Sequence, residues 1–478
     1  MPPSPPGLAL QKRGRTGGIS RSQPSGAKSP SISFAFVAAI AILQITYGGC
    51  AGHNDTRNAR FDVVGDFGAV CDDKTDDYEA IQSALDAAGR AGGGVVLLPS
   101  RTCKTGKTLH FNYSNITLSG KGKIDFVPIP PFVLYVNDRA VQINDSNVYA
   151  TNLPIAGPIK AGDRSFMAQS AGDAAGLNKG DWVVINEIDQ GAGSNIVAIE
   201  WTQVASVSGV NVTVQVPVRV NFPNTRPFIA PSVSGLGFFK VERLIENTAI
   251  SDIYVQVPQT AEPVPGIAVG VARNTTIMSV TVDVASGNGF FAYRSSGLRI
   301  VQSHQVHART QATEMAAVTD LVLSGNVFDN GQDPPPDTSS LTLDFGTGFF
   351  DVIDNRLINC GNICMQVAGG VHDGRISANS FGYVSDAGNR NTAGIVALGV
   401  NAVEITGNAL AGGAGESSTA VAARNTAGYT SNIVACGNQF GPNLISGFVI
   451  HYSPPVANDS CNVYVDSTES IRLPPLEF

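Results

Sequence analysis

The chain has 478 residues, more than the roughly 250 to 300 residues at which a single hydrophobic core stops growing. It is therefore either several domains or a solenoid, and 52 glycines with only 15% charged residues favour short strands joined by tight turns. A formal net charge of −8 argues against a nucleic-acid partner, because phosphate binding needs clustered Lys and Arg. An acidic polysaccharide remains an admissible partner, since a groove can be locally basic.

Residues 1–50 read as a leader and signal peptide. A Pro/Ser/Gly-rich stretch with five basic residues precedes an apolar run over 34–43 that is too short to span a bilayer. Cys50 follows Gly48 and Gly49 in a pattern similar to a bacterial lipoprotein cleavage site, with Tyr47 as a departure from it. We therefore expect a secreted or cell-surface protein and consider lipidation of Cys50 and membrane attachment through that anchor.

The next segment carries four aspartates within six residues, in "VCDDKTDDYEAIQSALDAAGRAGGG". Apolar Ile81, Ala84, Leu85 and Ala88 recur at helical spacing, which predicts an amphipathic helix. Thr75 or Asp76 would cap it, and Glu79 stands three residues after Asp76 as in a capping box. The cluster is therefore interpreted as the start of a helix that covers an open strand edge rather than as a metal site.

Six cysteines remain beyond Cys50, an even number in a chain with an export signal. We expect three disulfides, which pair Cys71 with Cys103, Cys360 with Cys364 and Cys436 with Cys461. No metal-ligand set is identified.

Residues 151–245 read as longer alternating strands and hairpins, for example "EWTQVASVSGVNVTVQVPVRV". We interpret this stretch as a β-rich insertion. It could wall a groove or serve as padding, and the sequence is compatible with both.

A repeat follows in residues 246–465. Five phrases of the type "LVLSGNVF" place asparagines at 326, 355, 379, 408 and 438, spaced by 29, 24, 29 and 30 residues. Each unit holds short strands and no helix, which indicates coils of a parallel β-helix with a stack of asparagines at one bend. His304 is expected to take the place of an asparagine in that stack.

The opening "FDVVGDFGAVCDDKTDDYEAIQSALDAAGRAGGGVVLLPSRTC" together with these coils resembles the pectate-lyase-like right-handed parallel β-helix superfamily, which includes polysaccharide lyases, polygalacturonase-related hydrolases and tailspike-like proteins. The resemblance implies an all-β solenoid with an N-terminal capping helix and a carbohydrate-active protein. It implies residues 51–150 as cap and first coils, 246–465 as main coils and 466–478 as a tail. It also allows a trimer and bound Ca²⁺, although no ligands for Ca²⁺ can be named.

Aligning the second strand of each unit identifies candidate site residues, since equivalent positions on neighbouring coils lie about 4.8 Å apart. The outward row contains Tyr293, Ala316, Asp344 and Gln366, and the row beside it contains Phe291, Glu314, Thr342 and Cys364. A glycosidase needs two carboxylates, for which Glu314 and Asp344 are the candidates. A lyase needs a base, for which Tyr293 or His307 qualifies, and cations to bind a uronate carboxylate, for which Arg294 and Arg309 qualify; Gln366 is a further substrate-binding candidate.

Three functions stay open. We favour an exported lyase acting on an acidic, uronate-containing polymer, because of the His/Arg cluster over 294–309. A glycoside hydrolase of the polygalacturonase-related type is the close alternative, although the Asn-Thr-Asp and Gly-His-Gly motifs of that type are absent. A non-catalytic glycan-binding surface lipoprotein or adhesin is the third.

Overall fold

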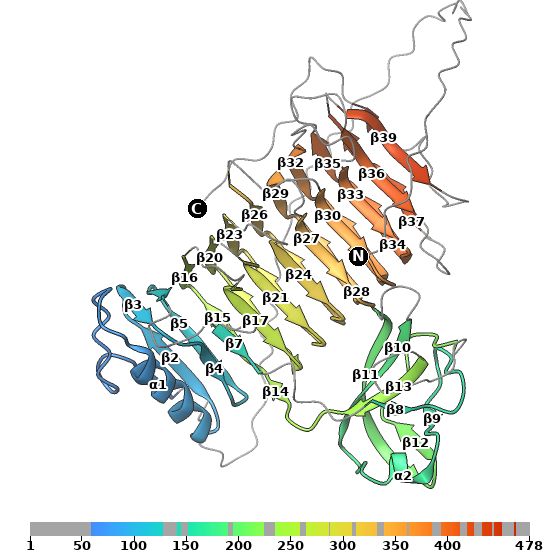
Figure 1. Ribbon diagram of the computed structural model, residues 1–478, viewed down its shortest axis with the longest axis horizontal. Coiled ribbons are helices and arrows are strands. Elements are labelled where there is room, and N and C mark those ends of the chain that lie inside the picture. Colours follow the sequence, from blue (N-terminus) through green and yellow to red (C-terminus); the bar gives the residue numbers. More distant parts are fainter. Residues whose placement is uncertain are drawn as a thin grey trace, which may run out of the picture. The chain divides into compact units, whose positions relative to one another are not determined.

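The computed structural model describes the greater part of the chain beyond residue 58. The described residues are 59–127, 141–144, 152–189, 195–223, 235–258, 264–285, 287–307, 312–331, 339–360, 363–384, 393–411, 418–424, 433–441, 444–451 and 463–464. They form a right-handed parallel β-helix with an N-terminal helix and a β-rich insertion, which confirms the predicted fold class. Three long parallel sheets run along the solenoid (Figure 1), and from residue 94 to residue 451 each coil contributes one strand to each sheet in the order A, B, C.

Sheet A has eleven strands. They are β1 (Arg60–Asp62), β2 (Gly94–Leu98), β5 (Ile116–Gly120), β15 (Ala249–Ser251), β19 (Thr276–Met278), β22 (Arg299–Val301), β25 (Val322–Ser324), β28 (Gly348–Ile353), β31 (His372–Ser377), β34 (Asn401–Thr406) and β37 (Ile433–Cys436).

Sheet B also has eleven strands. They are β3 (Thr102–Thr105), β6 (Lys123–Phe126), β16 (Tyr254–Val257), β20 (Thr281–Val284), β23 (His304–Val306), β26 (Val327–Asp329), β29 (Arg356–Cys360), β32 (Ser380–Val384), β35 (Ala409–Ala411), β38 (Gln439–Phe440) and β40 (Val463–Tyr464).

Sheet C has ten strands. They are β4 (Leu109–Phe111), β7 (Val141–Ile143), β17 (Ile267–Gly270), β21 (Phe290–Tyr293), β24 (Thr313–Ala316), β27 (Ser339–Asp344), β30 (Ile363–Ala368), β33 (Ala393–Leu398), β36 (Ser418–Arg424) and β39 (Leu444–His451).

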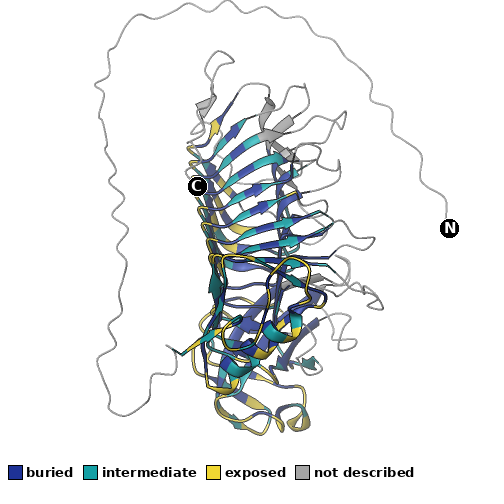
Figure 2. Ribbon diagram, turned by 90° about the vertical axis from the view of Figure 1, so that its left-hand side faces the viewer, coloured by how far each residue is buried: buried dark blue, intermediate teal, exposed yellow. Residues whose placement is uncertain are grey.

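The solenoid core consists of apolar side chains that alternate with outward polar ones along each short strand. In β21, for example, Phe290 and Ala292 are buried while Phe291 and Tyr293 are half-buried. Figure 2 shows this alternation as bands of buried and half-buried residues along the stacked strands. Because side chains in a strand alternate between faces, the outward positions of consecutive coils form straight rows.

The predicted asparagine stack lies at the bend between sheets A and B. The backbone N–H and the side-chain Nδ2 of Asn355 both donate to Oδ1 of Asn379, at 2.8 and 3.0 Å, and its Nδ2 also donates to the carbonyl of Leu323. The same pattern links Asn326, Asn355, Asn379, Asn408 and Asn438, all of them buried. Ser303, not His304, continues the stack, since its N–H donates to Asn326. His304 is one residue further on because it pairs with Val327 in sheet B, so the expectation for His304 was wrong.

The aspartate cluster is structural. Helix α1 (Tyr78–Arg90) packs Ile81, Leu85 and Ala88 onto the first coils. The carboxylate of Asp77 accepts the N–H groups of Val70 and Cys71, and Asp76 accepts that of Tyr78. The expected cap at Thr75 or Asp76 was wrong, because the N-cap residue is Asp77, which makes no side-chain cap hydrogen bond. The capping box is absent as well, and the carboxylate of Glu79 pairs with Lys107 at 3.2 Å.

The insertion lies between β7 and β14. It forms a six-stranded sheet and one short helix: β8 (Leu153–Pro154), β9 (Ser165–Met167), α2 (Ala171–Ala174), β10 (Trp182–Asp189), β11 (Asn195–Ser208), β12 (Asn211–Val214) and β13 (Gly235–Lys240). The chain then enters β14 (Ile245–Glu246), which pairs with β18 (Ala272–Arg273). The insertion has its own buried core, which includes Phe166, Phe222 and Phe238.

Two of the predicted disulfides are present, Cys71–Cys103 and Cys360–Cys364. Cys436 is disulfide-bonded as well, and its expected partner, Cys461, lies outside the described residues, as does Cys50. Among the residues that the structure describes, no helix combines the length and apolarity required to cross a membrane.

Replacing Asn379 with alanine should destabilise the solenoid by about 3 kcal/mol or more, since each buried polar group left without a partner costs roughly 1 to 3 kcal/mol. The change removes the acceptor of two Asn355 groups and the donor to the carbonyl of Val352. Chemical unfolding measures the effect.

Asn247→Gly provides the control, because Asn247 belongs to an exposed asparagine row, bonded to Asn115 and Asn274, and has a positive φ that glycine tolerates. We expect less than about 1 kcal/mol for this change. Equal losses for the two variants would contradict a special role of the buried stack.

Candidate functional site

The structure places most of the predicted site residues on sheet C. Tyr293, Glu314, Asp344 and Gln366 belong to the neighbouring strands β21, β24, β27 and β30, and Arg294 follows β21 directly. His307 follows β23 of sheet B, so it lies on a different sheet from the two carboxylates. Arg309 lies outside the described residues.

Glu314 and Asp344 lie on adjacent coils but not directly opposite one another. Glu314 pairs with Thr342, whereas Asp344 pairs with Ala316. A two-residue offset along the strand combined with one coil step separates their Cα atoms by about 8 Å. Both side chains face outward and are half-buried.

The Glu314 carboxylate is held in a desolvated position. Burial raises the pKa of the Glu314 carboxyl above its usual value, and the negative charge of Asp344 raises this pKa further. A hydrogen bond from the Asn288 amide to Oε2, at 3.2 Å, opposes the shift. Glu314 is therefore poised to keep a proton at a pH where an ordinary glutamate has lost it.

The Asp344 carboxylate is fixed by its own turn. Burial raises the pKa of Asp344, and the N–H of Phe345, which donates to Oδ1 at 2.7 Å, opposes that rise. The same oxygen rests against Gly369 of the next coil, where a Cβ would lie only 2.3 Å away. Gly369 thus leaves the space that this carboxylate occupies.

The predicted position of Gln366 was wrong by two residues. Gln366 pairs with Thr342 and so belongs to the row of Glu314, not to the row of Asp344. The prediction aligned apolar residues, but the coils are in register at the following turn, where the N–H of Gly346 donates to the carbonyl of Gly369. Cys364, expected in the Glu314 row, is buried in its disulfide.

Tyr293 and Arg294 lie where the solenoid meets the insertion. Tyr293 pairs with Ala316, and the Arg294 guanidinium lies 4.9 Å from the centre of the Tyr293 ring and 5.2 Å from that of Phe239 in the insertion. Ala317 and Phe345, which directly follow the two site strands, pack in the same apolar cluster as Phe239 and its neighbours. The insertion therefore borders the Asp344 end of the site.

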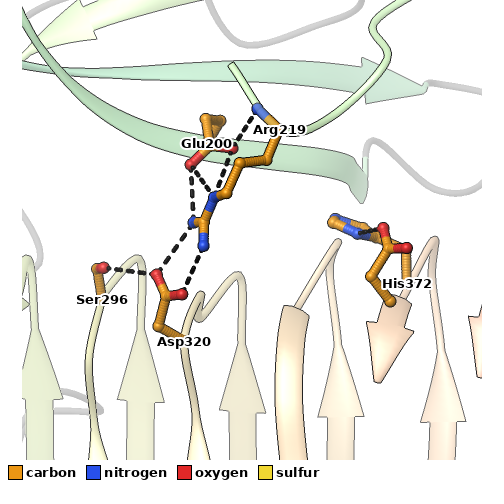
Figure 3. A network of polar contacts seen from close by, with 6 residues as sticks. Glu200, Arg219, Ser296, Asp320 and His372 are labelled. Atoms are coloured by element: carbon orange, nitrogen blue, oxygen red, sulfur yellow. Dashed lines mark hydrogen bonds and ion pairs between the residues drawn. The ribbon is translucent and has the colours of Figure 1, made fainter. Parts of the chain in front are cut away.

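A charged contact fixes the insertion at this border (Figure 3). Arg219 of the insertion binds Glu200 on its own side at 2.9 Å and Asp320 of the solenoid at 2.6 Å. Its guanidinium also stacks on Phe349, 3.9 Å from the ring centre. Since the Glu200 side chain is only 3% exposed, losing the arginine would leave a buried charge without its partner.

His307 has partners on sheet B. Its Nδ1 lies 3.1 Å from Oδ1 of Asp283, whose other oxygen accepts the Tyr254 hydroxyl at 2.8 Å. Burial lowers the pKa of the neighbouring His304. His307 is thus part of a separate polar group rather than of the carboxylate site.

The described residues contain one group of His, Cys, Asp or Glu side chains at metal-ligand spacing, formed by Cys71, Asp77 and Cys103. Its two sulfur atoms form a disulfide, so they cannot act as thiolate ligands. This group does not fit Ca²⁺, which prefers oxygen ligands.

Sequence reasoning missed three residues that shape these sites: Asn288, Gly369 and Asp283. Asn288 precedes β21 without a motif, and Gly369 resembles any turn glycine. The coil alignment could have found Asp283, because it stands one coil before Val306, the residue next to His307.

Comparison with known proteins gives a short sequence match and distant structural similarities. No family model matches the chain. The curated alginate lyase 7 of Azotobacter vinelandii is 68% identical over 37 residues, which is 8% of this chain and 4% of that protein's length.

Solved structures are similar to this chain at low identity, with TM-scores below 0.5. The tailspike protein gp49 of Pseudomonas phage LKA1 has 15% identity and a TM-score of 0.46, with 80% of this chain and 72% of that chain covered. The A-module of the Azotobacter vinelandii mannuronan C-5 epimerase AlgE6 has 16% identity and a TM-score of 0.39, with 85% and 99% covered. The gp54 tailspike of Acinetobacter baumannii bacteriophage AP22, solved with a capsular saccharide, has 13% identity and a TM-score of 0.40, with 82% and 75% covered.

Replacing Asp344 with asparagine should lower the pKa of Glu314, because the neighbouring negative charge that disfavours its ionisation is removed. Carbon-detected NMR titration of the Glu314 carboxyl measures this shift. Asp351→Asn, on sheet A, is the control and should leave that titration unchanged. An unaltered Glu314 titration in the Asp344 variant would show that the two carboxylates do not interact.

Proposed function

We propose that the protein is an exported carbohydrate-active enzyme that hydrolyses glycosidic bonds of a polysaccharide on the outer face of sheet C. One observation carries the proposal: two half-buried carboxyl groups with raised pKa lie on adjacent coils of one face. Glycosidases of both stereochemical types use such a pair.

The two carboxyl groups differ in a way that suits separate roles. Glu314 has its pKa raised both by burial and by the charge of Asp344, so it serves as the acid that protonates the leaving glycosidic oxygen. Asp344, which accepts the Phe345 N–H, is the better carboxylate and acts on the opposite side of the sugar.

The charge of the site favours a neutral polymer. With Glu314 protonated, the Asp344 carboxylate is the charged member of the pair, and it would repel a polyuronate, because like charges at short range disfavour each other. Among the three open functions, a hydrolase of a neutral glycan thus fits sheet C better than the lyase favoured on sequence grounds.

A lyase acting on an acidic polymer is the second candidate, and the Tyr293–Arg294 contact supports it. Tyr293 could take the proton beside a uronate carboxylate that Arg294 binds. Unsaturated products would identify this reaction, whereas a hydrolase releases reducing ends without them.

Glu314→Gln and Asp344→Asn should each lower the turnover of a cleaved polysaccharide at least about a hundredfold, as expected for loss of an acid–base group. Reducing-sugar release from a panel of neutral and uronate polymers measures this, with absorbance of unsaturated products recorded in parallel. Arg375→Gln, in an exposed ion pair on sheet A, is the control. Unchanged turnover in both carboxylate variants would refute the assignment, and no product from any polymer would favour the glycan-binding adhesin.

Gly369→Ala should reduce activity more than tenfold while the protein stays folded, because its Cβ displaces the Asp344 carboxylate. Gly407→Ala controls for backbone strain, since its φ of +65° matches the +66° of Gly369 and the nearest atom to its Cβ is 4.0 Å away. The comparison uses turnover at equal folded fraction. If both variants lose activity equally, backbone strain rather than the carboxylate position is responsible.

A further inference from the structure

Sheet B carries a polar strip that the proposed reaction does not use. The strip consists of Lys123, Tyr254, Asp283 and His307, which come from four successive coils, β6, β16, β20 and the residue after β23. Its register is set by the pairs Lys123–Tyr254, Gln256–Asp283 and Asp283–Val306.

The strip is tied together by direct contacts. The Lys123 ammonium lies 5.7 Å from the centre of the Tyr254 ring, and the Tyr254 hydroxyl donates to Asp283. Burial and this hydrogen bond to Asp283 raise the pKa of Tyr254, so the hydroxyl stays protonated and keeps donating. These contacts fix the Asp283 side chain, which is 19% exposed, in a position where its carboxylate can bind the His307 imidazole.

His307 is held in one orientation and is nevertheless accessible. Its backbone has a φ of +61°, which turns the residue out of the strand, and its ring packs against Gly331, where a Cβ would lie 2.9 Å from Cδ2. Asp329 fixes Gly331 by accepting its N–H at 2.8 Å. The imidazole side chain remains 60% exposed.

The hydrogen bond to Asp283 determines what the neutral imidazole offers. When Nδ1–H donates to the carboxylate, Nε2 carries the lone pair and accepts a hydrogen bond from a ligand. The pairing places Lys123 and Tyr254 at one position and Asp283 and His307 two and three residues further along their strands, so the strip crosses the coils diagonally. A fixed acceptor, an aromatic ring and an ammonium along this diagonal match the hydroxyl-rich surface of a sugar chain. The coil spacing of about 4.8 Å is close to the length of one sugar unit, so successive units of a chain that crosses the coils along this diagonal would meet successive coils.

We propose that the sheet B strip is a second glycan-binding surface, for a neutral, hydroxyl-rich polysaccharide, in which His307 Nε2 accepts a sugar hydroxyl and Asp283 positions the imidazole. The inference rests on the proposed carbohydrate role but not on catalysis. Through this surface the protein would hold a polymer on sheet B, while the carboxyl groups of Glu314 and Asp344 lie on sheet C.

The test measures binding with the Glu314→Gln protein, so that turnover does not interfere. Isothermal titration with xylan, mixed-linkage β-glucan and galactomannan, and with alginate as the anionic probe, gives the parent affinities. Adding His307→Ala should weaken binding of at least one neutral polymer about tenfold, and Asp283→Asn should weaken it in the same direction. Adding Arg375→Gln on sheet A should change nothing.

Thermal melting identifies any variant that fails to fold. Tyr254→Phe is then used in place of that variant, because it removes only the hydroxyl group that donates to Asp283. Parent affinity in both His307→Ala and Asp283→Asn would overturn the inference, as would the absence of binding to all four polymers. The proposed hydrolysis can fail independently of the proposed binding surface. If the wild-type protein binds a glycan through the strip but releases no product, the hydrolase proposal is refuted and the binding surface is supported.

Discussion

The parallel pairing of each coil with the next is the constraint on which the rest of this structure depends. Every strand hydrogen-bonds to its equivalent on the following coil. Each side chain therefore has a counterpart, of the same or of another residue type, about 4.8 Å further along the axis. This pairing turns single residues into rows. The buried asparagine stack uses the repetition for stability, since each member satisfies the backbone and side chain of its neighbour.

The candidate site lies where the outward row of side chains changes from one coil to the next. Glu314 has the small polar Thr342 opposite it, and Asp344 has Ala316 opposite it, so the two carboxylates approach diagonally instead of stacking face to face. Both are half-buried, and burial raises the pKa of both carboxyl groups. The insertion borders the Asp344 end through Phe239, Phe345 and the Arg219 contact, which fixes one side of the site.

The fold could be predicted because its signals are local and repeated. Five asparagines at near-constant spacing and an amphipathic helix before a run of glycines each require only short-range periodicity. The rows could be predicted as far as Asp344. Gln366 was misplaced because apolar residues match in both registers of β30, and in the observed one Leu341 pairs with Met365 and Leu343 with Val367. His307 lies only seven residues before Glu314 in the chain, yet the two residues belong to different sheets, because the bend between sheets B and C lies between them. Their closeness in sequence therefore did not predict that they lie on separate faces. The contact of Arg219 with Asp320 spans about a hundred residues and has no sequence signature.

The most direct measurement of the central claim is a structure of the Glu314→Gln protein with an uncleaved oligosaccharide bound. We expect a sugar chain along the outer face of sheet C, with one glycosidic oxygen next to residue 314 and the anomeric carbon of that bond facing Asp344. A chain that occupies sheet C without approaching either residue, or a glycan bound only elsewhere on the protein, would contradict it.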